Sequence, residues 1–545
     1  MKRNILLALA IFVFYPGFTQ NTVGVQLNTS NSLNGYTLFS PRTSQTPRYT
    51  YLMDNCGEIV NQWESQFPLF STDLLMPDGS LYRSVVDNQS TLDLPGNTGR
   101  IEHLDWDGNL LWGLTYSDTD FSFHHDFAVL PNGNILMLVA HRRSEAEAIA
   151  EGRDPLTIEN GELYEESVIE IEPVGTDGFN IVWEWYSWDH LIQDFDNTQN
   201  NFGLVEDHPE LVDINFGTSF GEADWWHSNS MSYSPALDQI TISNRNLDEF
   251  IIIDHSTTTA EAATSSGGNS NMGGDLLYRW GNPQSYRQGT PGDQVLFGMH
   301  DVHFIPEGSP DAGKIMIFNN GDDIGFTAIQ IMTPPYDPNT QNYPYAGGAY
   351  GPSDLDYEYV DPIDPTNFFA SFLSGSQQLP NGNVLICNGP FGRLFEVDLN
   401  DNRVWEYQSP VSNSGILSDG DDPSSEQVRV FRALRYPTDY PAFDGRDLTP
   451  IGPIENNPVN DDCILDVTDF SDELQLSVYP TLVDNTFTVE TSTSSFQLSI
   501  YNIQGQVIQQ LNSQKTVDVS YLNTGMYFVE LTSSNRRSVV KIIKR

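Results

Sequence analysis

Residues 297–321, "FGMHDVHFIPEGSPDAGKIMIFNNG", contain the pattern that decides the fold. A His-Asp pair leads into a short apolar run, a turn with the order Pro-x-Gly, and a second apolar run. Residues 123–139, "FHHDFAVLPNGNILMLV", repeat this order closely. Two short apolar runs joined by such a turn are typical of a β-hairpin. Because the hairpin recurs, the sequence predicts a repeat architecture.

Five copies of this hairpin align on the turn proline. In each copy the proline lies six residues after the first residue shown: "STDLLMPDG" from Ser71, "HDFAVLPNG" from His125, "NSMSYSPAL" from Asn229, "HDVHFIPEG" from His300 and "SGSQQLPNG" from Ser374. A second hairpin follows at variable distance and ends in or near a tryptophan, as in "HLDWDGNLLW" from His103. Two hairpins make four strands, which is one blade of a β-propeller.

A sixth blade is predicted from the two ends of the repeat region. Residues 36–63 lack a leading strand, whereas residues 427–437, "QVRVFRALRYP", leave one strand over. Joined, the two segments complete a blade and close the ring. We therefore predict an all-β fold with a six-bladed β-propeller over residues 21–455. The alternative, a β-sandwich, does not explain the offset that the five turns share.

The segments that flank this region have a different composition. Residues 1–20, "MKRNILLALAIFVFYPGFTQ", place two basic residues before a short apolar run, which predicts a secretory signal peptide; an N-terminal membrane anchor is the alternative. Residues 456–473 are predicted to be a linker, and residues 474–545 a small C-terminal β-sandwich. No other long apolar segment occurs, so we expect no stable membrane insertion.

Charge and cysteine content exclude some functions. The chain has 74 acidic and 25 basic residues, a formal net charge of −49, which makes a nucleic-acid partner improbable. Its three cysteines are far apart, so neither a disulfide scaffold nor a zinc motif is predicted. We accordingly expect no cofactor and no metal.

Polar residues mark the start of the apolar repeat strands. The innermost strands of a propeller line its central channel, so equivalent positions should recur around one mouth. The positions six before the turn prolines are Ser71, His125, Asn229, His300 and Ser374, with His124 and His227 beside them. A single histidine there would be explained as structural, but several on separate blades predict a functional site.

Four of these stretches carry a family resemblance. "FHHDFAVLPNGN", "DWWHSNSMSYSPALDQITISNR", "FGMHDVHFIPEG" and "SGSQQLPNGNVLICNG" resemble the bacterial arylsulfotransferases, and the similarity runs from about Tyr36 to Ile454. The resemblance implies a six-bladed propeller that moves a sulfuryl group from a phenolic sulfate donor to a phenolic acceptor. It also implies a ping-pong mechanism through a sulfohistidine, without a nucleotide sulfate donor. The absence of a GxxxxGK[ST] phosphate loop agrees with this.

The resemblance implies a role for each candidate residue. His300 matches the nucleophile, and His227, Arg245 and His125 match further catalytic residues. His124 competes with His125 for its place, and we expect His124, Asn229 and Ser374 to contact the substrate. A guanidinium and two imidazoles can hold the oxygens of a sulfate monoester, and a protonated histidine can donate to the departing phenoxide. We expect Asp301 to orient a strand or a ring.

The C-terminal region carries a second resemblance. "VYP", "IYNIQGQVI" and the basic end "KIIKR" are similar to the C-terminal sorting domain of the type IX secretion system. This implies a Gram-negative bacterium, export through the periplasm to the cell surface or beyond, and the secretion machinery as partner. A carbohydrate-binding sandwich is the alternative for this tail.

Two other functions remain possible for the propeller. His125, His227 and His300 could bind iron or zinc in a metalloenzyme, although Arg245 at the same mouth would repel a cation. Alternatively, the protein binds ligands at its rim and does not turn them over.

Overall fold

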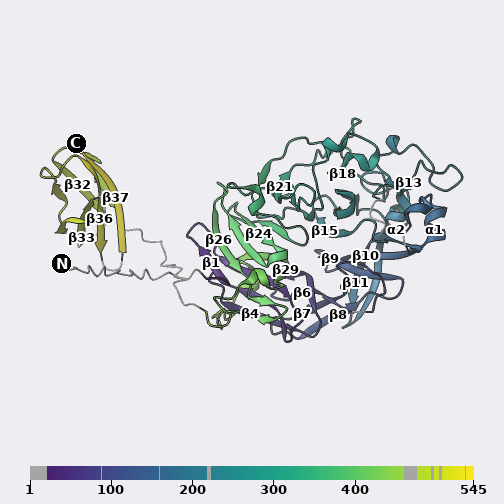
Figure 1. Ribbon diagram of the computed structural model, residues 1–545, viewed down its shortest axis with the longest axis horizontal. Helices are drawn as coiled ribbons and strands as arrows, with labels where there is room; N and C mark the ends of the chain where they lie inside the picture. Colours follow the sequence, from purple (N-terminus) through teal and green to yellow (C-terminus); the bar gives the residue numbers. More distant parts are fainter. Residues whose placement is uncertain are drawn as a thin grey trace, which may run out of the picture. The chain divides into compact units, whose positions relative to one another are not determined.

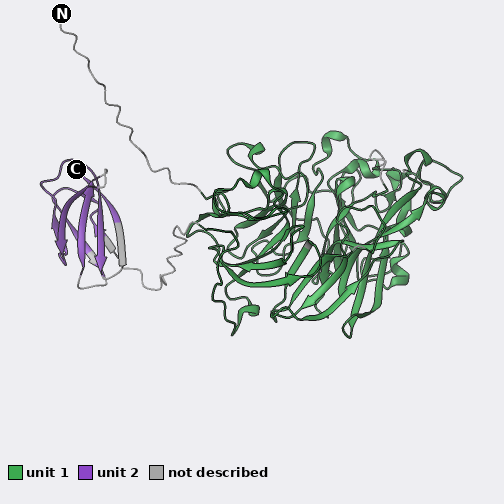
Figure 2. Ribbon diagram, turned by 60° about the horizontal axis from the view of Figure 1, so that its bottom comes forward, with its two compact units in different colours: residues 1–463 green, residues 464–545 purple. Residues whose placement is uncertain are grey.

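The computed structural model describes residues 21–87, 89–158, 160–217, 223–458, 476–491, 496–502, 506–533 and 536–545. The chain divides into two compact units, unit 1 up to residue 463 and unit 2 from residue 464 (Figure 2). The predicted signal peptide and most of the predicted linker lie outside the described residues. The α-helices found among the described residues are α1 (Glu145–Ala150) and α2 (Thr259–Ala262), and no helix there is long and apolar enough to cross a membrane.

Four antiparallel sheets of unit 1 follow one another along the chain. Each has four strands in sequence order, and the turn proline lies between the first and second strands: β5 (Leu69–Leu75), β6 (Leu81–Val86), β7 (Gly99–Leu104) and β8 (Leu110–Thr115); β9 (Phe121–Val129), β10 (Ile135–Ser144), β11 (Glu162–Val174) and β12 (Gly178–Tyr186); β15 (Ser228–Ser234), β16 (Gln239–Asn244), β17 (Glu249–Asp254) and β18 (Tyr278–Trp280); β19 (His300–Phe304), β20 (Ile315–Asn319), β21 (Ala328–Met332) and β22 (Tyr357–Tyr359). The predicted hairpin pairs are thus present as whole sheets.

Two further sheets combine segments that are distant in sequence. The fifth contains β23 (Gly375–Gln378), β24 (Val384–Asn388), β25 (Arg393–Val397) and β26 (Arg403–Gln408), and β1 (Gly24–Asn28) adds an unpredicted fifth strand at its edge. In the sixth, β29 (Arg429–Pro437) pairs with β2 (Gly35–Arg42), followed by β3 (Arg48–Met53) and β4 (Ile59–Ser65). The predicted pairing of the leftover strand with the N-terminal segment is therefore correct.

The first strands of the six sheets, β5, β9, β15, β19, β23 and β29, are called the inner strands here. Each contacts the next one in this order, and β29 contacts β5, so the contacts form a closed cycle. Figure 1 labels β9, β15 and β29 of this cycle. Apolar clusters fill the space between neighbouring sheets. One joins Ile101 and Trp112 of the first sheet to Phe127 and Ile169 of the second. This arrangement has the radial repetition of a propeller.

The tryptophans that close the second hairpins also join the sheets. The indole Nε1 of Trp63 on β4 donates to the carbonyl of Asp105 in the next sheet at 3.0 Å, and Trp112 on β8 donates to Gly178 at 2.9 Å. Trp185, Trp280 and Trp405 each donate to a carbonyl of the following sheet in the same way. Tryptophan suits this position of the repeat because its ring packs in the apolar space between two sheets while its N–H donates a hydrogen bond to a backbone carbonyl.

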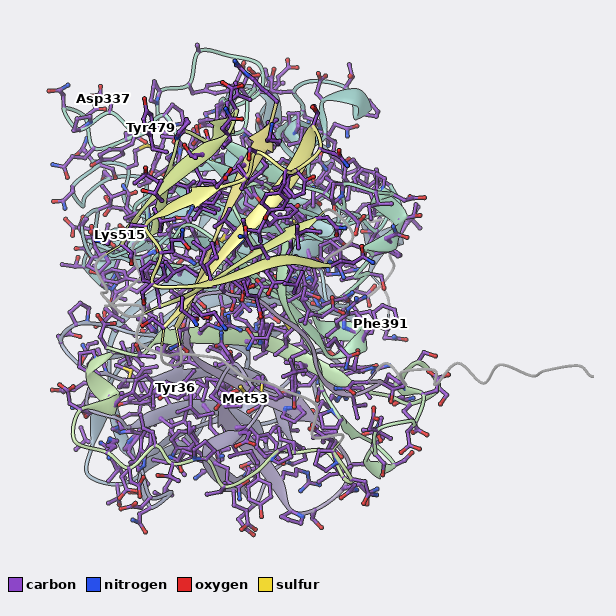
Figure 3. The ribbon with its side chains drawn as sticks, turned by 90° about the vertical axis from the view of Figure 1, so that its left-hand side faces the viewer. Tyr36, Met53, Asp337, Phe391, Tyr479 and Lys515 are labelled. Carbon is purple, nitrogen blue, oxygen red and sulfur yellow. The ribbon has the colours of Figure 1, made fainter. Side chains whose placement is uncertain are left out.

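The sixth sheet is covered by the segment that follows β29. Tyr36 on β2, labelled in Figure 3 with Met53 on β3, packs edge-on against Phe443 with ring centroids 4.7 Å apart. Short strands β13 (Leu191–Ile192) and β14 (Val212–Asp213) form a parallel pair outside the six sheets.

Unit 2 contains two small sheets. One has the order β30 (Leu476–Tyr479), β32 (Thr486–Thr491), β35 (Thr516–Asp518), and the other the order β31 (Leu482–Val483), β37 (Arg536–Lys544), β36 (Gly525–Ser533), β33 (Gln497–Asn502), β34 (Val507–Asn512). Val478 and Phe487 of the first sheet share one apolar cluster with Leu498 and Val529 of the second. Unit 2 therefore has a core of its own.

Candidate active site

The inner strands begin with irregular backbone. His125, His227 and Asp301 have φ angles of +50°, +51° and +49°, which L-residues adopt rarely. The strand register shifts within β15 and β19 close to these residues, between Ser228 and Ser230 and between His300 and His303. Such bulges redirect side chains at the ends of strands. Simple alternation between His300 and His303, which would place the two rings on opposite sides, is thus interrupted.

His300 is held in one orientation by Asn320. Its Nδ1 lies 2.8 Å from Oδ1 of Asn320, whose amide nitrogen donates to the carbonyls of Ala370 and Leu373 at 2.5 and 3.2 Å. Because both amide hydrogens are used, Asn320 can only accept from His300, which places the imidazole proton on Nδ1. Burial, with a smaller contribution from Arg245, lowers the pKa of His300 to about 3. His300 is therefore a buried neutral imidazole with a lone pair on Nε2.

His227 is paired with a carboxylate. Its Nδ1 lies 2.5 Å from Oδ2 of Asp224, and the backbone carbonyl of Asp224 accepts from the side chain of Asn246. The His227 side chain is 12% exposed, and that of Asp224 is 4% exposed. The carboxylate thus fixes the orientation of the His227 ring.

His125 stands beside His227, with ring centroids 4.9 Å apart. Its Nδ1 lies 2.9 Å from Nδ1 of His124, and Nε2 of His124 lies 2.9 Å from Oε2 of Glu166. The other Glu166 oxygen accepts from the backbone N–H of Ser228 at 3.2 Å. Burial, followed by the neighbouring His227, lowers the pKa of His125 well below its ordinary value.

The backbone near Gly96 leaves room for the His125 ring. A Cβ on Gly96 would lie 2.1 Å from Nε2 of His125, and the backbone N–H of His125 donates to the Gly96 carbonyl at 2.9 Å. A side chain at position 96 would displace His125, so the loop before β7 also shapes the site.

Arg245 directly follows β16, and its positive charge helps to lower the pKa of His300. Its guanidinium pairs with Asp322, and both side chains are 26% exposed. Burial raises the pKa of Asp322 to about 6, even though Arg245 acts in the opposite direction. A carboxylate thus occupies donors of Arg245 that a sulfuryl oxygen would need.

Three of the predicted substrate contacts are bonded within the protein. Asn229 donates to the Met299 carbonyl at 2.8 Å and accepts from Ser243 at 2.5 Å, and the hydroxyl of Ser374 accepts from the backbone N–H of Gly389 at 2.9 Å. Both ring nitrogens of His124 have partners, as described above. The structure thus brings His125, His227, His300 and Arg245 together, with these three residues as their support.

The alignment on the turn proline missed a second ring. The positions five before the prolines, including Pro437 of the sixth sheet, are Thr72, Asp126, Ser230, Asp301, Gly375 and Arg432. Asp126, Ser230 and Asp301 each accept from a backbone N–H of the next inner strand, at 3.1, 2.8 and 2.7 Å. This axial ring, as we call it, ties neighbouring sheets together.

Arg432 provides the charge balance of the axial ring. Its guanidinium lies 3.2 Å from an Asp126 oxygen and 3.0 Å from an Asp301 oxygen. Burial alone would raise the pKa of Asp301, but Arg432 and His303 outweigh it and hold the value at about 2. Gly375 has no side chain because a Cβ there would lie 2.5 Å from Asp301. Asp301 thus orients strands in this structure, in line with the expectation.

Other residues of the site had no sequence signal. Glu166 and Asn320 lie on other segments than the histidines they support, and Asp224, three residues before His227, stands in a quoted stretch without having been singled out. Arg432 could have been found by extending the alignment to Pro437. Across the described ranges, no group of three or more His, Cys, Asp or Glu side chains is arranged to hold a metal ion.

Solved structures with some similarity to this chain share little sequence with it. A protein of unknown function from Bacteroides caccae is 10% identical, with 74% of this chain and 98% of that chain covered and a TM-score of 0.38. Virginiamycin B lyase from Staphylococcus aureus is 10% identical over 70% and 87% of the chains, with a TM-score of 0.31. The periplasmic gluconolactonase of Pseudomonas aeruginosa is 12% identical over 92% and 99%, with a TM-score of 0.32.

Family comparisons match both units. Residues 21–408 match the family described as Arylsulfotransferase (ASST), and residues 477–545 match the secretion system C-terminal sorting domain. A search of curated proteins found no match. The sorting domain implies export and a location at the cell surface or outside the cell. The chain belongs to the arylsulfotransferase family and ends in a type IX sorting domain.

Proposed function

We propose that this protein transfers a sulfuryl group from a phenolic sulfate ester to a phenolic acceptor, with His300 as the covalent carrier. Family membership supports the reaction class. The observation that carries the mechanism is the Asn320 amide, which fixes the proton of His300 on Nδ1 and leaves Nε2 as the nucleophilic atom.

In the first half-reaction, the lone pair of His300 Nε2 attacks the sulfur of the donor. The bond between sulfur and the phenolic oxygen breaks, and its electron pair leaves with the phenoxide. The resulting N-sulfonated imidazole carries a positive charge that is shared by Nδ1–H. The Asn320 oxygen, 2.8 Å from Nδ1, accepts that hydrogen and stabilises the charge.

His227 is the group best placed to supply a proton. Paired with Asp224, its protonated ring donates to the departing phenoxide and becomes neutral. In the second half-reaction, the neutral ring takes the proton of the acceptor phenol. The phenolate then attacks the sulfur, the N–S bond breaks, and His300 regains its lone pair. The cycle returns both histidines to their starting states.

His125 and Arg245 serve as donors to the sulfuryl oxygens. When His124 carries a hydrogen on Nδ1, it donates that hydrogen to Nδ1 of His125. The hydrogen of the His125 ring then lies on Nε2, which becomes a donor. Arg245 contributes its guanidinium once the substrate replaces Asp322. The bonds that Asn229, Ser374 and His124 make to protein groups favour a supporting role for them over the predicted substrate contact.

A donor pulse without acceptor tests the covalent step. With para-nitrophenyl sulfate, we expect a burst of about one nitrophenol per active site, followed by slow hydrolysis. Intact mass should increase by one sulfuryl group, and digestion should place it on the peptide "MHDVHF" at His300. His303 of the same peptide, whose Nδ1 lies 3.0 Å from the Asp301 carbonyl oxygen, is the internal control.

Four outcomes would contradict the proposal. Turnover with no burst and no adduct, or an adduct on His303, would remove His300 as the carrier. No nitrophenol release with any phenolic acceptor would favour a binding protein without turnover. One tightly bound metal per purified chain would favour the metalloenzyme alternative.

The domain limits and the route of export are also proposals. The closed cycle of inner strands supports a six-bladed propeller over residues 21–455, and the shared core of two sheets supports a sandwich over residues 474–545. A signal peptide at residues 1–20, a linker at 456–473 and recognition of the tail by the type IX machinery complete the proposed organisation. Deletion of the tail should then leave a folded, active enzyme that is no longer delivered outside the cell.

A further inference from the structure

Arg42 and Arg429 lie directly opposite each other at the ends of paired strands β2 and β29. In the described part of unit 1 they are the two arginines with neither a carboxylate nor a carbonyl partner. Eleven others lie within 4.0 Å of a carboxylate oxygen, namely Arg83, Arg100, Arg142, Arg143, Arg245, Arg279, Arg287, Arg393, Arg403, Arg432 and Arg435. Arg48, Arg153 and Arg446 donate to backbone carbonyls.

This pairing of like charges is unfavourable in the free protein. Like charges directly opposite on neighbouring strands destabilise a sheet. Burial, together with the charge of Arg429, lowers the pKa of Arg42. Carboxylates are not scarce in a chain with 74 acidic and 25 basic residues. Two adjacent guanidinium groups without a counter-ion are therefore a feature that an anionic ligand would stabilise.

Aromatic side chains connect the two arginines to the histidine cluster. The guanidinium carbon of Arg42 lies 4.6 Å from the ring centroid of Phe70, and the Phe70 ring lies 6.1 Å from that of Phe431. Phe431 in turn lies 6.3 Å from the His125 ring. Phe431 occupies the position six before Pro437, equivalent to that of His125 and His300 in their sheets. The guanidinium of Arg429 lies over Phe372, at 5.3 Å.

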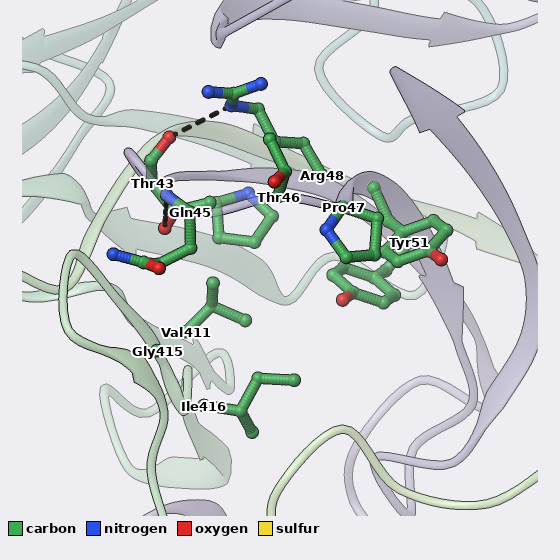
Figure 4. A pocket seen from close by; sticks show the side chains of 11 residues that line it. Thr43, Gln45, Thr46, Pro47, Arg48, Tyr51, Val411, Gly415 and Ile416 are labelled. Atoms are coloured by element: carbon green, nitrogen blue, oxygen red, sulfur yellow. Dashed lines mark hydrogen bonds between the residues drawn. The ribbon is translucent and has the colours of Figure 1, made fainter. Parts of the chain in front are cut away.

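In the neighbouring pocket, the guanidinium of Arg48 has hydrogen-bond partners within the protein. Figure 4 shows this pocket. It is lined by residues from the β2–β3 connection, by Val411 on β27 (Val411–Ser412) and by Ile416 on β28 (Gly415–Ile416). Arg48 there donates from Nε to the carbonyl of Thr43 at 3.3 Å and from a terminal nitrogen to that of Ser44 at 3.3 Å. Its guanidinium is thus held by the backbone, and Arg48 provides a matched control for Arg42.

We infer that Arg42 and Arg429 bind a second anionic group of the aromatic substrate, such as a carboxylate or another sulfate. This inference rests on the proposed function and defines its substrate class. The substrate ring would lie along Phe431 and Phe70, and its anionic substituent would reach the two guanidinium groups. The planar fork of an arginine suits a carboxylate or a sulfate better than a point charge does.

Matched donors test the inference. The donor para-sulfooxybenzoate is compared with its neutral amide, para-sulfooxybenzamide, by the ratio of their kcat/KM values at saturating phenol. The comparison is repeated with a two-ring pair, the biphenyl sulfate that carries a carboxylate at its far end and the corresponding amide. The ratio of acid to amide is then measured in Arg42→Gln, Arg429→Gln and the double variant. Since intrinsic reactivity cancels between enzymes, we expect at least one of the two ratios to fall by about three- to ten-fold for each arginine. The loss should shrink at high salt.

Arg48→Gln removes a charge from the same sheet and should leave the ratio unchanged. If Arg48→Gln lowers the acid-to-amide ratio equally, the effect comes from the overall positive charge of the sheet and the inference is wrong. The inference is also wrong if the double variant keeps the wild-type ratio for both donor lengths. Thermal unfolding provides a readout without turnover, because para-hydroxybenzoate or its two-ring analogue should stabilise the wild type more than the corresponding amide does. Selective stabilisation in an inactive wild type would uphold the anion site and reject the proposed reaction instead.

Discussion

Two arginines near the axis of unit 1 have opposite surroundings. Arg432 belongs to the axial ring and is held between Asp126 and Asp301, both of which are almost fully buried. Arg245 lies at the histidine cluster and has one carboxylate partner, Asp322, that is itself 26% exposed. The first arginine cannot change partners without leaving two buried carboxylates unpaired. The second can exchange one partly exposed carboxylate for another anion.

Residues that support the fold and residues of the proposed site differ in position by a single residue along the inner strands. The histidines and the axial ring are adjacent along the inner strands, as His125 and Asp126 or His300 and Asp301 show. Asp126, Ser230 and Asp301 of the axial ring accept hydrogen bonds from the next inner strand. His125, His227 and His300 each have one ring nitrogen bonded within the protein, and we propose that the other serves the reaction. A short repeat therefore encodes both the axial ring and the histidines of the proposed site.

The largest effect should come from His300→Ala. Removing a covalent nucleophile should lower kcat by about 10⁴ to 10⁶. The variant should remain folded, because the lost bond to Asn320 costs about 1–3 kcal/mol. Steady-state kinetics and thermal unfolding of the purified protein measure both values. His303→Ala is the control on the same strand, and a His300→Ala enzyme with more than about a tenth of wild-type activity would contradict the assignment.

Arg432→Met should instead affect stability. It leaves Asp126 and Asp301 buried without their cation, at a cost of about 3–5 kcal/mol in the free energy of unfolding. Arg429→Met, three residues earlier on the same strand, removes an arginine without a carboxylate partner and relieves its like-charge pairing with Arg42, so stability should stay the same or rise slightly. Urea unfolding measures the difference between the two variants. A loss below about 1 kcal/mol for Arg432→Met would mean that the axial ring is not a stabilising element.

The pH dependence of stability should follow from the same ring. The pKa of Asp301 is lowered to about 2, below its ordinary value near 4. A lowered carboxyl pKa contributes stability above the unfolded value and loses it as pH falls toward the folded value. In Arg432→Met, burial acts on Asp301 without the arginine and should raise its pKa, so the loss of stability on acidification, followed by urea unfolding at a series of pH values, should become smaller or reverse.

The sequence predicted the strands well because each hairpin is a local pattern. Turn prolines, apolar runs and closing tryptophans recur at fixed positions, and even the pairing of β29 with β2 followed from counting the hairpins. The candidate nucleophile and its neighbours also lie on these strands. Their ring proximity, such as that of His125 and His227, agrees with one shared mouth.

The supporting contacts could not be predicted from local patterns. Asn320 acts on His300 only because two carbonyls from the segment before β23 fix its amide. Glu166 reaches His124 from the third strand of its sheet, and the bulges on the inner strands decide which ring points where. These are long-range contacts and backbone irregularities, which alternation along a strand does not encode.

The smallest effect should come from Asp322→Asn, which tests whether the partner of Arg245 is exchangeable. Burial raises the pKa of Asp322 to about 6, so the carboxylate competes with the donor for Arg245 mainly above that pH. In the wild type, the KM for the nitrophenyl sulfate donor should therefore fall as pH decreases through about 6. In Asp322→Asn it should be about three- to ten-fold lower at neutral pH and lose that pH dependence. Asp248, whose pKa burial also raises to about 6, titrates in the same range and should contribute equally in both enzymes. Asp323→Asn removes a charge from the same loop, yet the Arg245 guanidinium keeps its Asp322 partner, so the KM should change little. An Asp322→Asn enzyme with a higher KM for the donor would show that Asp322 positions Arg245 for catalysis, and the two arginines would then differ in exposure alone.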